Sequence, residues 1–419
     1  MKIDRGLILA GGLAVAASAC ASAGTGTAAP GASAAASVPA LQCAAGAPAA
    51  TQFATASQAA LNRTAVFQGP AATPYYTTAM EQARAGIAAD AANPLHHYLA
   101  AQAAIGLNNY AAADSAFRRT LELCPGAATE VTPLRQRAAL MSFNAGVEAY
   151  NQRNDTTAAL AAWQTAGQLN NELPQTYLNQ GVVYSARGDA VRAAAAYRET
   201  LAAAERASRD TARAADAASA RADALAGLVN VGAQLFTRNQ FAQAGEIFSS
   251  VHAADPNNRD AWYNHALALY RLQRWNDLIP VANEVIRRDP LNYNARIIQF
   301  NAYKGLSDAA KAARNTSVER TNRDLALSTL TAADQLPVQM QTAQLSTTES
   351  QARIAGTVVG ATARAGTPIN LEFTFYGPAG AVGTQRVTVN APAKDQPANF
   401  EVVLPTTAPV TGYSYRVVS

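Results

Sequence analysis

Residues 255–290 read DPNNRDAWYNHALALYRLQRWNDLIPVANEVIRRDP, and this stretch decides the fold. Its opening dipeptide, Asp255-Pro256, recurs as Asp289-Pro290, 34 residues later. Between these marks, side chains fall where a pair of helices needs them: Trp262 and Ala266 on a first helix, Trp275 and Val285 on a second. Two helices in such a period, with a proline to stop the second, predict one antiparallel hairpin of a repeating array.

Two upstream units carry the same pattern. The preceding one has, at the corresponding steps, Leu228, Gly232, Phe241, Ala244, Phe248 and Pro256. The clearest one has Tyr177, Gly181, Tyr184, Gly188, Ala193, Tyr197 and Thr200. On these residues the chain resembles the tetratricopeptide repeat (TPR) family. The resemblance implies a mainly α fold, a TPR-type α-solenoid of antiparallel helical hairpins, here over residues 51–337.

Earlier units fit the pattern less closely. One matches if a residue is inserted in its turn, with Gly146, Ala159, Trp163 and Ala166 in place. Another follows a first helix over about 95–107 with Tyr110, Ala113, Phe117 and Pro125 in a second-helix pattern. A further half-hairpin is expected over 75–91.

Two departures from the period are expected to change the helices. The small residue of the first helix recurs at Gly232, 51 residues after Gly181 instead of 34. The added residues, near 202–224, contain no Gly or Pro, so we expect long helices that protrude past their neighbours. These form either a docking arm or a solvated extension. The last unit starts near Asn294, and a loop over about 306–317 is expected to displace its second helix. We interpret this hairpin as the terminal cap.

The TPR resemblance also implies a concave groove lined by the first helices of the hairpins, which binds peptides or helices. Carried over position by position, its lining would be Gln175, Leu178, Val182, Phe236, Asp260, Tyr263, Leu267, Tyr270, Ile297, Asn301 and Lys304. This set lacks the Lys and Asn pattern by which one TPR subfamily clamps a C-terminal carboxylate. A partner with apolar anchors is favoured, and the alternative for Tyr263 and Tyr270 is ordinary packing against a neighbouring helix.

After Pro337 the apolar period changes from that of helices to that of strands. Residues 338–351, rich in Gln, Thr and Ser, are interpreted as a linker. Further on, apolar and polar residues alternate, with Ile369, Leu371, Phe373 and Phe375 on one face. With the runs that follow, this pattern predicts about five short strands in a small all-β, immunoglobulin-like sandwich over 352–419.

The order of features in this module resembles the FxLYD type of bacterial extracytoplasmic domain. These features are Gly356 in a first strand, Phe373 to Tyr376 before a Gly-containing turn, then a Phe-containing strand and a Tyr-rich last one. The resemblance implies a role in cell-envelope adhesion or assembly, without a catalytic motif. Candidates for an exposed aromatic platform are Tyr376, Tyr413 and Tyr415, although alternation favours Tyr413 and Tyr415 as core residues.

The N-terminus is typical of an exported protein. Residues 1–19 have a short charged start and an apolar run, as in a signal peptide. Ala17-Ser18-Ala19-Cys20 resembles a bacterial lipobox, which implies lipid attachment at Cys20; the alternative is a secreted protein cut before an incidental Cys20. Residues 20–50, mostly Ala, Gly, Ser, Thr and Pro, are expected to form a flexible tether. Ala21 rather than Asp after the cysteine favours an outer-membrane lipoprotein on the periplasmic side of the cell envelope.

Two further cysteines remain, Cys43 and Cys124. An exported chain meets an oxidising compartment, so they either pair as a disulfide or stay free, and the sequence leaves this open.

Composition and motifs exclude several function classes. A formal net charge of +4 in 419 residues gives no argument for nucleic-acid binding. His96 and His97 are adjacent, so they cannot share the helix face that a metal site needs. The sequence contains no nucleophile elbow, phosphate loop or zinc-type cysteine spacing. We therefore expect no enzyme activity, no cofactor and no metal.

The sequence as a whole predicts a non-catalytic scaffold of the bacterial cell envelope. It would bind a protein partner in the TPR groove and touch the membrane through its N-terminal lipid only. Two alternatives remain: an accessory subunit that presents substrate to an envelope enzyme, and a glycan- or peptidoglycan-binding module in the C-terminal sandwich. The partner, the pathway and the oligomeric state are left open.

Overall fold

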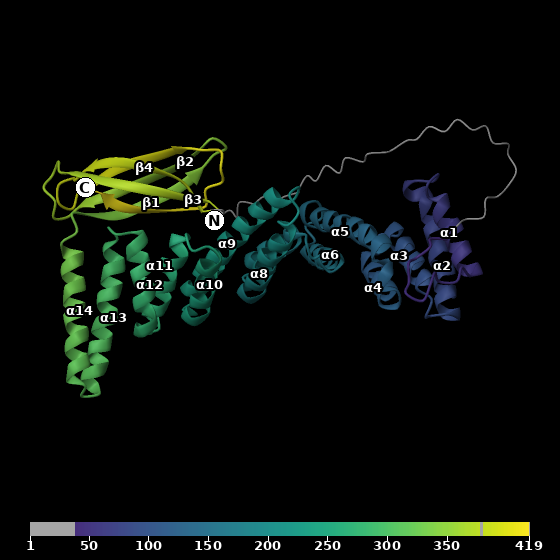
Figure 1. Cartoon of the computed structure of the whole chain (residues 1–419), viewed down its shortest axis with the longest axis horizontal. Coiled ribbons are helices and arrows are strands. Elements are labelled where there is room, and N and C mark those ends of the chain that lie inside the picture. Colours follow the sequence, from purple (N-terminus) through teal and green to yellow (C-terminus); the bar gives the residue numbers. More distant parts are fainter. Residues whose placement is uncertain (1–37, 378–379, 419) are drawn as a thin grey trace. The chain divides into compact units, whose positions relative to one another are not determined.

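The computed structural model describes residues 38–377 and 380–418. Helical hairpins come first in the chain and strands last (Figure 1). The predicted fold class, a mainly α array of hairpins followed by a small all-β module, is confirmed. The signal peptide and Cys20 lie outside the described residues.

The chain forms two compact units. The first contains the described residues up to Val183 together with Glu199–Ala220; the second contains Tyr184–Arg198 and the chain from Arg221 onward. Most of the first unit is built from α1 (Gln52–Arg63), α2 (Thr73–Ala89), α3 (Pro94–Gly106), α4 (Tyr110–Leu123), α5 (Ala128–Asn151) and α6 (Thr156–Leu169), with short 3-10 turns at Gly69–Ala72 and Pro125–Ala127. Divided between the units are α7 (Pro174–Ala186), α8 (Ala190–Ala207) and α9 (Ala214–Thr237).

The helices of the second unit continue the array. They are α10 (Phe241–Ala254), α11 (Arg259–Arg271), α12 (Trp275–Arg288), α13 (Tyr293–Ala312) and α14 (Thr316–Asp334). Each tight turn between the two helices of a hairpin uses one residue in the left-handed region: Asn108, Asn154, Gly188, Asn239, Gln273 and Arg314, with φ between 52° and 73°. This conformation lets the chain reverse directly after a helix, and Gly and Asn adopt it at least cost.

Glycines bring the helices together at the aromatic positions. In each pair a glycine lies directly under a ring: Gly106 and Tyr76, Gly146 and Trp163, Gly167 and Tyr177, Gly227 and Tyr197, Gly232 and Phe248, Gly305 and Trp275. A Cβ added to any of these glycines would lie 2.2–2.8 Å from the nearest atom of the aromatic side chain. The rings therefore fill space that only a residue without a side chain leaves free.

Two expectations about the helices need correction. The loop expected over about 306–317 is mostly helix, because α13 continues to Ala312 and the turn occupies only the next three residues. Near 202–224 the long helices do form, as α8 and α9. Their alanines Ala204, Ala207 and Ala217 bury against one another, so the inner face of this extension is packed rather than solvated.

The segment before α1 is partly joined to the body. Cys43 and Cys124 form a disulfide with their Cα atoms 5.0 Å apart, across 81 residues of chain. Leu41 is fully buried in the core of α1–α5. The tether expected over 20–50 therefore does not extend through its last residues, which pack on the first unit.

The strands form two three-stranded antiparallel sheets. One has the order β1-β2-β5 and the other β4-β3-β6. Their bounds are β1 (Val338–Thr347), β2 (Gln351–Gly360), β3 (Pro368–Gly377), β4 (Gly380–Asn390), β5 (Pro397–Pro405) and β6 (Gly412–Val418). The linker predicted over 338–351 is wrong for β1, which pairs along its whole length with β2 and has a bulge between Met340 and Thr342.

The alternation that predicted the sandwich core is confirmed. Ile369, Leu371, Phe373 and Phe375 of β3 are at most 7% exposed, and Tyr413 and Tyr415 of β6 are 5% and 3% exposed. The Phe373 ring stacks on the Tyr415 ring with centroids 5.1 Å apart. An exposed aromatic platform that includes Tyr413 and Tyr415 is therefore wrong.

The sandwich core is completed by a residue from the helical array. Leu291, in the turn between α12 and α13, is 2% exposed and belongs to the same buried cluster as Phe373 and Tyr415. Its carbonyl accepts a hydrogen bond of 2.9 Å from the Met340 N–H of β1. The last repeat and the sandwich thus share one apolar core.

A buried polar contact fixes this junction. In earlier repeats the side chain of the Asp or Asn at the end of the second helix accepts a hydrogen bond from the backbone N–H two residues later. Asp255, for example, accepts from the Asn257 N–H at 3.1 Å. At Asp289 the corresponding N–H, that of Leu291, donates instead to Tyr415 Oη at 3.2 Å, and Tyr415 Oη donates to Asp289. Burial, and then the Asp289 carboxylate, raise the pKa of Tyr415 well above its usual range, so the phenol stays protonated and can donate.

Replacing Gly232 by alanine is expected to destabilise the chain, because the added Cβ would lie 2.6 Å from the buried Phe248 ring. We expect a loss of about 1–3 kcal/mol. The matched control is Gly245→Ala in the same hairpin, where the nearest atom is 3.5 Å away and the removal of a helical glycine should stabilise by about 0.5–1 kcal/mol. Urea unfolding measures both, and equal effects would contradict the ring-contact argument.

Tyr415→Phe should destabilise the second unit by about 1–3 kcal/mol, because it leaves the Asp289 carboxylate and the Leu291 N–H without the buried hydroxyl. Tyr376→Phe is the control. It removes a half-buried hydroxyl that bonds Ser414 Oγ at 3.1 Å and should cost about 0.5 kcal/mol or less. Thermal unfolding of the two variants compares them directly, and a neutral Tyr415→Phe would show that the junction does not depend on this contact.

Candidate partner-binding site

The predicted groove residues are divided between the two units. Gln175, Leu178 and Val182 of α7 belong to the first unit, and Leu178 is buried at 6% exposure. The second unit contains Phe236 on α9, then Asp260, Tyr263, Leu267 and Tyr270 on α11, then Ile297, Asn301 and Lys304 on α13. Most of the predicted groove residues therefore lie in the second unit.

Two of these residues meet at a cleft between α11 and the sandwich. Asp260 and Tyr263 line a hollow of about 240 Å³ together with Asn294 of α13 and the β1 residues Gln341 and Thr342. Asp260 and Asn294 are exposed, and Tyr263 is half-buried. Burial, and then the Asp289 carboxylate, raise the pKa of Tyr263. The first-helix face thus ends at β1, in a polar cleft with one aromatic wall.

A second cleft follows the outer edge of β1. It measures about 570 Å³ and is lined by Asn257–Asp260 at the start of α11, by residues 342–345 and by residues 411–413. A third hollow of about 550 Å³ lies on the outer face of the β1-β2-β5 sheet around Gly356. Thr342 lines all three. The clefts are therefore continuous around the middle of β1.

The charges at these clefts are mostly neutralised. Arg259 bonds Asp289 at 2.5 Å, donates to Tyr413 Oη and lies over the Tyr413 ring at 4.5 Å from its centroid. Arg288 pairs with Glu284. Asp260 has no ion-pair partner among residues 38–377 and 380–418. It is therefore the one lining carboxylate there that is left to meet a ligand cation.

A stack of rings supports the start of α11. The His252 ring lies on the Trp262 ring with centroids 3.7 Å apart, and its Nε2 is 3.0 Å from Nδ1 of His265. The Arg288 guanidinium covers Trp262 at 4.8 Å from the ring centroid. Trp262 in turn donates from Nε1 to the Pro256 carbonyl at 2.9 Å. This stack joins the start of α11 to α10 and α12.

Other predicted groove residues pack on neighbouring side chains. The Phe236 ring meets the Phe241 ring edge-on with centroids 5.0 Å apart, and Tyr270 packs against Trp275 at 5.9 Å. Lys304 is paired with Asp308 on its own helix at 2.8 Å. Asn301, Leu267 and Ile297 are half-buried. Of the two tyrosines proposed for the groove, Tyr263 lines the cleft of about 240 Å³ and Tyr270 packs against Trp275, and both are half-buried against the core of α11–α13.

Sequence reasoning missed the contribution of β1. Gln341, Thr342 and Ala343 line the cleft beside Tyr263, yet they lie in the segment interpreted as a linker. Their signal was weak, because the extra bulge residue Gln341 puts the apolar positions 338 and 340 out of step with those at 343 and 345.

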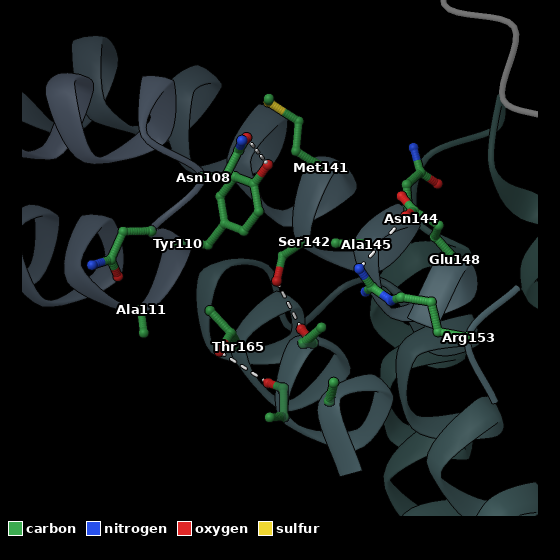
Figure 2. Close-up of a pocket in the computed structure, with 14 residues that line it drawn as sticks. Asn108, Tyr110, Ala111, Met141, Ser142, Asn144, Ala145, Glu148, Arg153 and Thr165 are labelled. Carbon is green, nitrogen blue, oxygen red and sulfur yellow. Dashed lines mark hydrogen bonds and ion pairs between the residues drawn. The ribbon is translucent and has the colours of Figure 1, made fainter. Parts of the chain in front are cut away.

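A cleft in the first unit has a different character. Figure 2 shows it between the α3–α4 turn, α5 and α6, with a volume of about 760 Å³. Several of its polar groups are bonded within the protein: Tyr110 Oη donates to Asn108, Ser142 Oγ donates to the Ala162 carbonyl, and Arg153 lies 3.6 Å from Glu148. Alanines form much of the remaining lining. No group of side chains in this cleft converges on a ligand position.

Among the described residues, no cluster of three or more His, Cys, Asp or Glu side chains is placed to hold a metal ion. His96 is a core residue, with Nε2 2.8 Å from Thr51 Oγ1. Within 38–377 and 380–418, none of the helices combines the length and the apolar character needed to cross a bilayer.

Comparison with known proteins gives similarity only to solved structures. No family model matches the chain, and no curated protein does. The chain is similar to MamA (41-end) from Desulfovibrio magneticus RS-1, at 17% identity and a TM-score of 0.26, covering 47% of this chain and 94% of that one. It is also similar to YrrB, described as a TPR protein with an unusual peptide-binding site, at 16% identity and a TM-score of 0.27, covering 53% and 93%.

A third similar structure is the C-terminal part of a TPR repeat-containing protein from Cytophaga hutchinsonii, at 14% identity and a TM-score of 0.25, covering 68% of this chain and 95% of that one. TM-scores this low carry no argument. The description of the hairpins and clefts therefore rests on this chain alone.

The ring stack should make stability depend on pH. Burial lowers the pKa of His252 to about 4, and His265 and Arg288 add to this effect. An unfolded histidine has a pKa near 6.5. Between about pH 6.5 and about pH 4, the unfolded chain therefore binds a proton at His252 that the folded chain does not bind. Stability is thus full above about pH 6.5 and falls as the pH drops toward about 4.

His252→Gln removes this titration, so its melting temperature should fall less on acidification than that of the natural chain, by about 2 °C or more. The control is His97→Gln, which changes a half-buried histidine of the first unit that lies outside the ring stack. Thermal unfolding at neutral and acidic pH measures the difference, and parallel curves for all three proteins would contradict the assignment.

Proposed function

We propose that this protein is a non-catalytic scaffold that binds a protein partner through the first-helix face of α11 and α13. The observation that carries the proposal is the cleft where Asp260, Tyr263 and Asn294 meet β1. It is an open, polar hollow with one aromatic wall, and among the described residues no group of three or more His, Cys, Asp or Glu side chains could hold a metal ion there. Such a surface suits recognition of a peptide segment.

The cell envelope is proposed as the place of action. The support is the signal-like start of the sequence, the lipobox-like Cys20 and the Cys43–Cys124 disulfide, since disulfides persist in oxidising compartments. The protein would be attached through a lipid at Cys20 to the outer membrane and would present its clefts on the periplasmic side. An accessory role beside an envelope enzyme is compatible with the same clefts, and the captured partner would identify it.

An affinity pull-down from solubilised envelopes tests the function. The double variant Asp260→Lys/Asn294→Lys changes two exposed side chains of the cleft. Its matched control is Asn276→Lys/Asp334→Lys, with the same chemical change at exposed positions of α12 and α14. We expect a partner that is retained by the natural chain and the control and reduced at least about tenfold by the cleft variant, which corresponds to about 1.4 kcal/mol.

Melting temperatures of the two variants must agree before the comparison. A partner recovered equally by both would show that binding occurs elsewhere on the chain. An enzyme among the partners lost with the cleft variant would favour the accessory role.

A further inference from the structure

The outer edge of β1 carries backbone groups that point away from its sheet. The Thr348 N–H donates to the Gln351 carbonyl at 2.8 Å, which sets the alternation of the β1–β2 ladder. Thr342, Gln344 and Ser346 therefore face β2, whereas the N–H and C=O groups of Ala343, Leu345 and Thr347 point outward. On the near side of the bulge, the outward Met340 N–H is bonded to Leu291.

Most of these outward groups have no partner inside the protein. The Ala343 carbonyl accepts from Tyr413 Oη at 2.5 Å. In the part of the chain that the structure describes, no hydrogen bond engages the Ala343 N–H or the N–H and C=O groups of Leu345 and Thr347. The edge thus offers five main-chain groups to a ligand, and the four of Leu345 and Thr347 are consecutive.

The sequence of β1 leaves this edge unprotected. Residues 338–348 contain no Asp, Glu, Lys, Arg or Pro. The strands at the other sheet edges do carry such residues: Arg386 in β4, Glu401 between Pro397 and Pro405 in β5, and Arg416 in β6. Charges and prolines are the usual means by which proteins block strand addition, so β1 is the edge at which it can occur.

The cleft beside this edge has the size of a short strand. An extended residue occupies roughly 160 Å³, from a rise of about 3.4 Å, a strand spacing of about 4.8 Å and a thickness of about 10 Å. The cleft of about 570 Å³ along residues 342–345 therefore holds about three to four residues of extended chain. Its far wall is the start of α11, which leaves room for one strand beside β1 and not for the edge of a whole sheet.

Charge identifies the side chain that such a strand should carry. Among the residues lining this cleft, the two charged ones are Arg259 and Asp260. Arg259 is bonded to Asp289 and covered by Tyr413, so the cleft presents the Asp260 carboxylate alone. A lysine or arginine on the added strand would meet it.

We propose that the β1 edge binds an extended peptide segment of a partner protein as an additional strand, with a basic side chain directed at Asp260. This inference rests on the proposed function and specifies how the partner is held. Main-chain hydrogen bonds to Leu345 and its neighbours supply binding, and the Asp260 carboxylate supplies selectivity.

The probe is a synthetic eight-residue peptide of alternating threonine and valine with one central lysine, beside the same peptide with glutamate at that position. Binding to the full chain is followed by amide hydrogen exchange at single residues. The lysine peptide should protect the Ala343, Leu345 and Thr347 amides, while Thr342, Gln344 and Ser346, already bonded to β2, serve as internal controls. The glutamate peptide should bind about two- to fivefold more weakly, and Asp260→Asn should remove that difference.

Two variants separate the contribution of the Leu345 main chain to peptide binding from that of its side chain. Leu345→Pro removes the outward N–H, whereas Leu345→Ala shortens the side chain and keeps it. Peptide binding should be lost in the first and kept in the second, with equal melting temperatures for the two. Binding that survives Leu345→Pro, unchanged exchange at the outward amides, or no binding of either peptide at millimolar concentration would overturn the proposal.

Two other outcomes are distinguishable. Protection of the same amides by the chain alone, rising with its concentration, would make the occupant a second copy and overturn the peptide assignment. If the peptide leaves the exchange of the edge amides unchanged while the Asp260→Lys/Asn294→Lys variant still loses its envelope partner, strand addition is wrong and partner binding at the Asp260–Asn294 cleft stands. If that variant retains the partner while the peptide protects the edge amides, partner binding at this cleft is wrong instead.

Discussion

The array of hairpins depends on the contact between a glycine and an aromatic ring. Gly146 under Trp163 and Gly232 under Phe248 place two helices at a distance that a methyl group would not allow. A large ring then fills the gap, so each of these helix pairs gains apolar burial and close packing at the same point. Because the contact recurs from α2–α3 to α12–α13, the array keeps its hairpin geometry even where helices are lengthened.

The junction with the sandwich reuses a repeat position for a new contact. In the earlier repeats the polar residue that ends the second helix caps the next turn locally, as Asp255 does. At Asp289 the same carboxylate faces Tyr415 and Arg259, and the hydroxyl of Tyr415 takes over the turn N–H. The candidate site lies beside this contact, since Arg259 and Asp289 line the same cleft as Asp260 and Tyr263.

Much of the fold could be predicted because its signals are local. The spacing of small and aromatic residues identified the hairpins, and the alternation at Ile369–Phe375 identified a buried strand. β1 was not predicted because its fully buried residues, Val338 and Met340, come before the bulge, and after it only Ala343 and Leu345 pack against the core, each half-buried. Leu291 and the Tyr415–Asp289 contact join residues more than a hundred positions apart, for which a single sequence contains no signal. Of the residues predicted to line the groove, Asp260 and Tyr263 line the cleft, whereas Phe236 and Tyr270 pack against neighbouring rings.

The shared core at Leu291 has a consequence for how this chain can be divided. A cut at Pro337 respects the change from helices to strands, yet it would leave the sandwich with an empty position where Leu291 belongs and with Tyr415 facing no acidic partner. A fragment for expression, or for grafting onto another protein, should therefore contain the sandwich together with α11–α13. The helices and the strands would then keep their shared core.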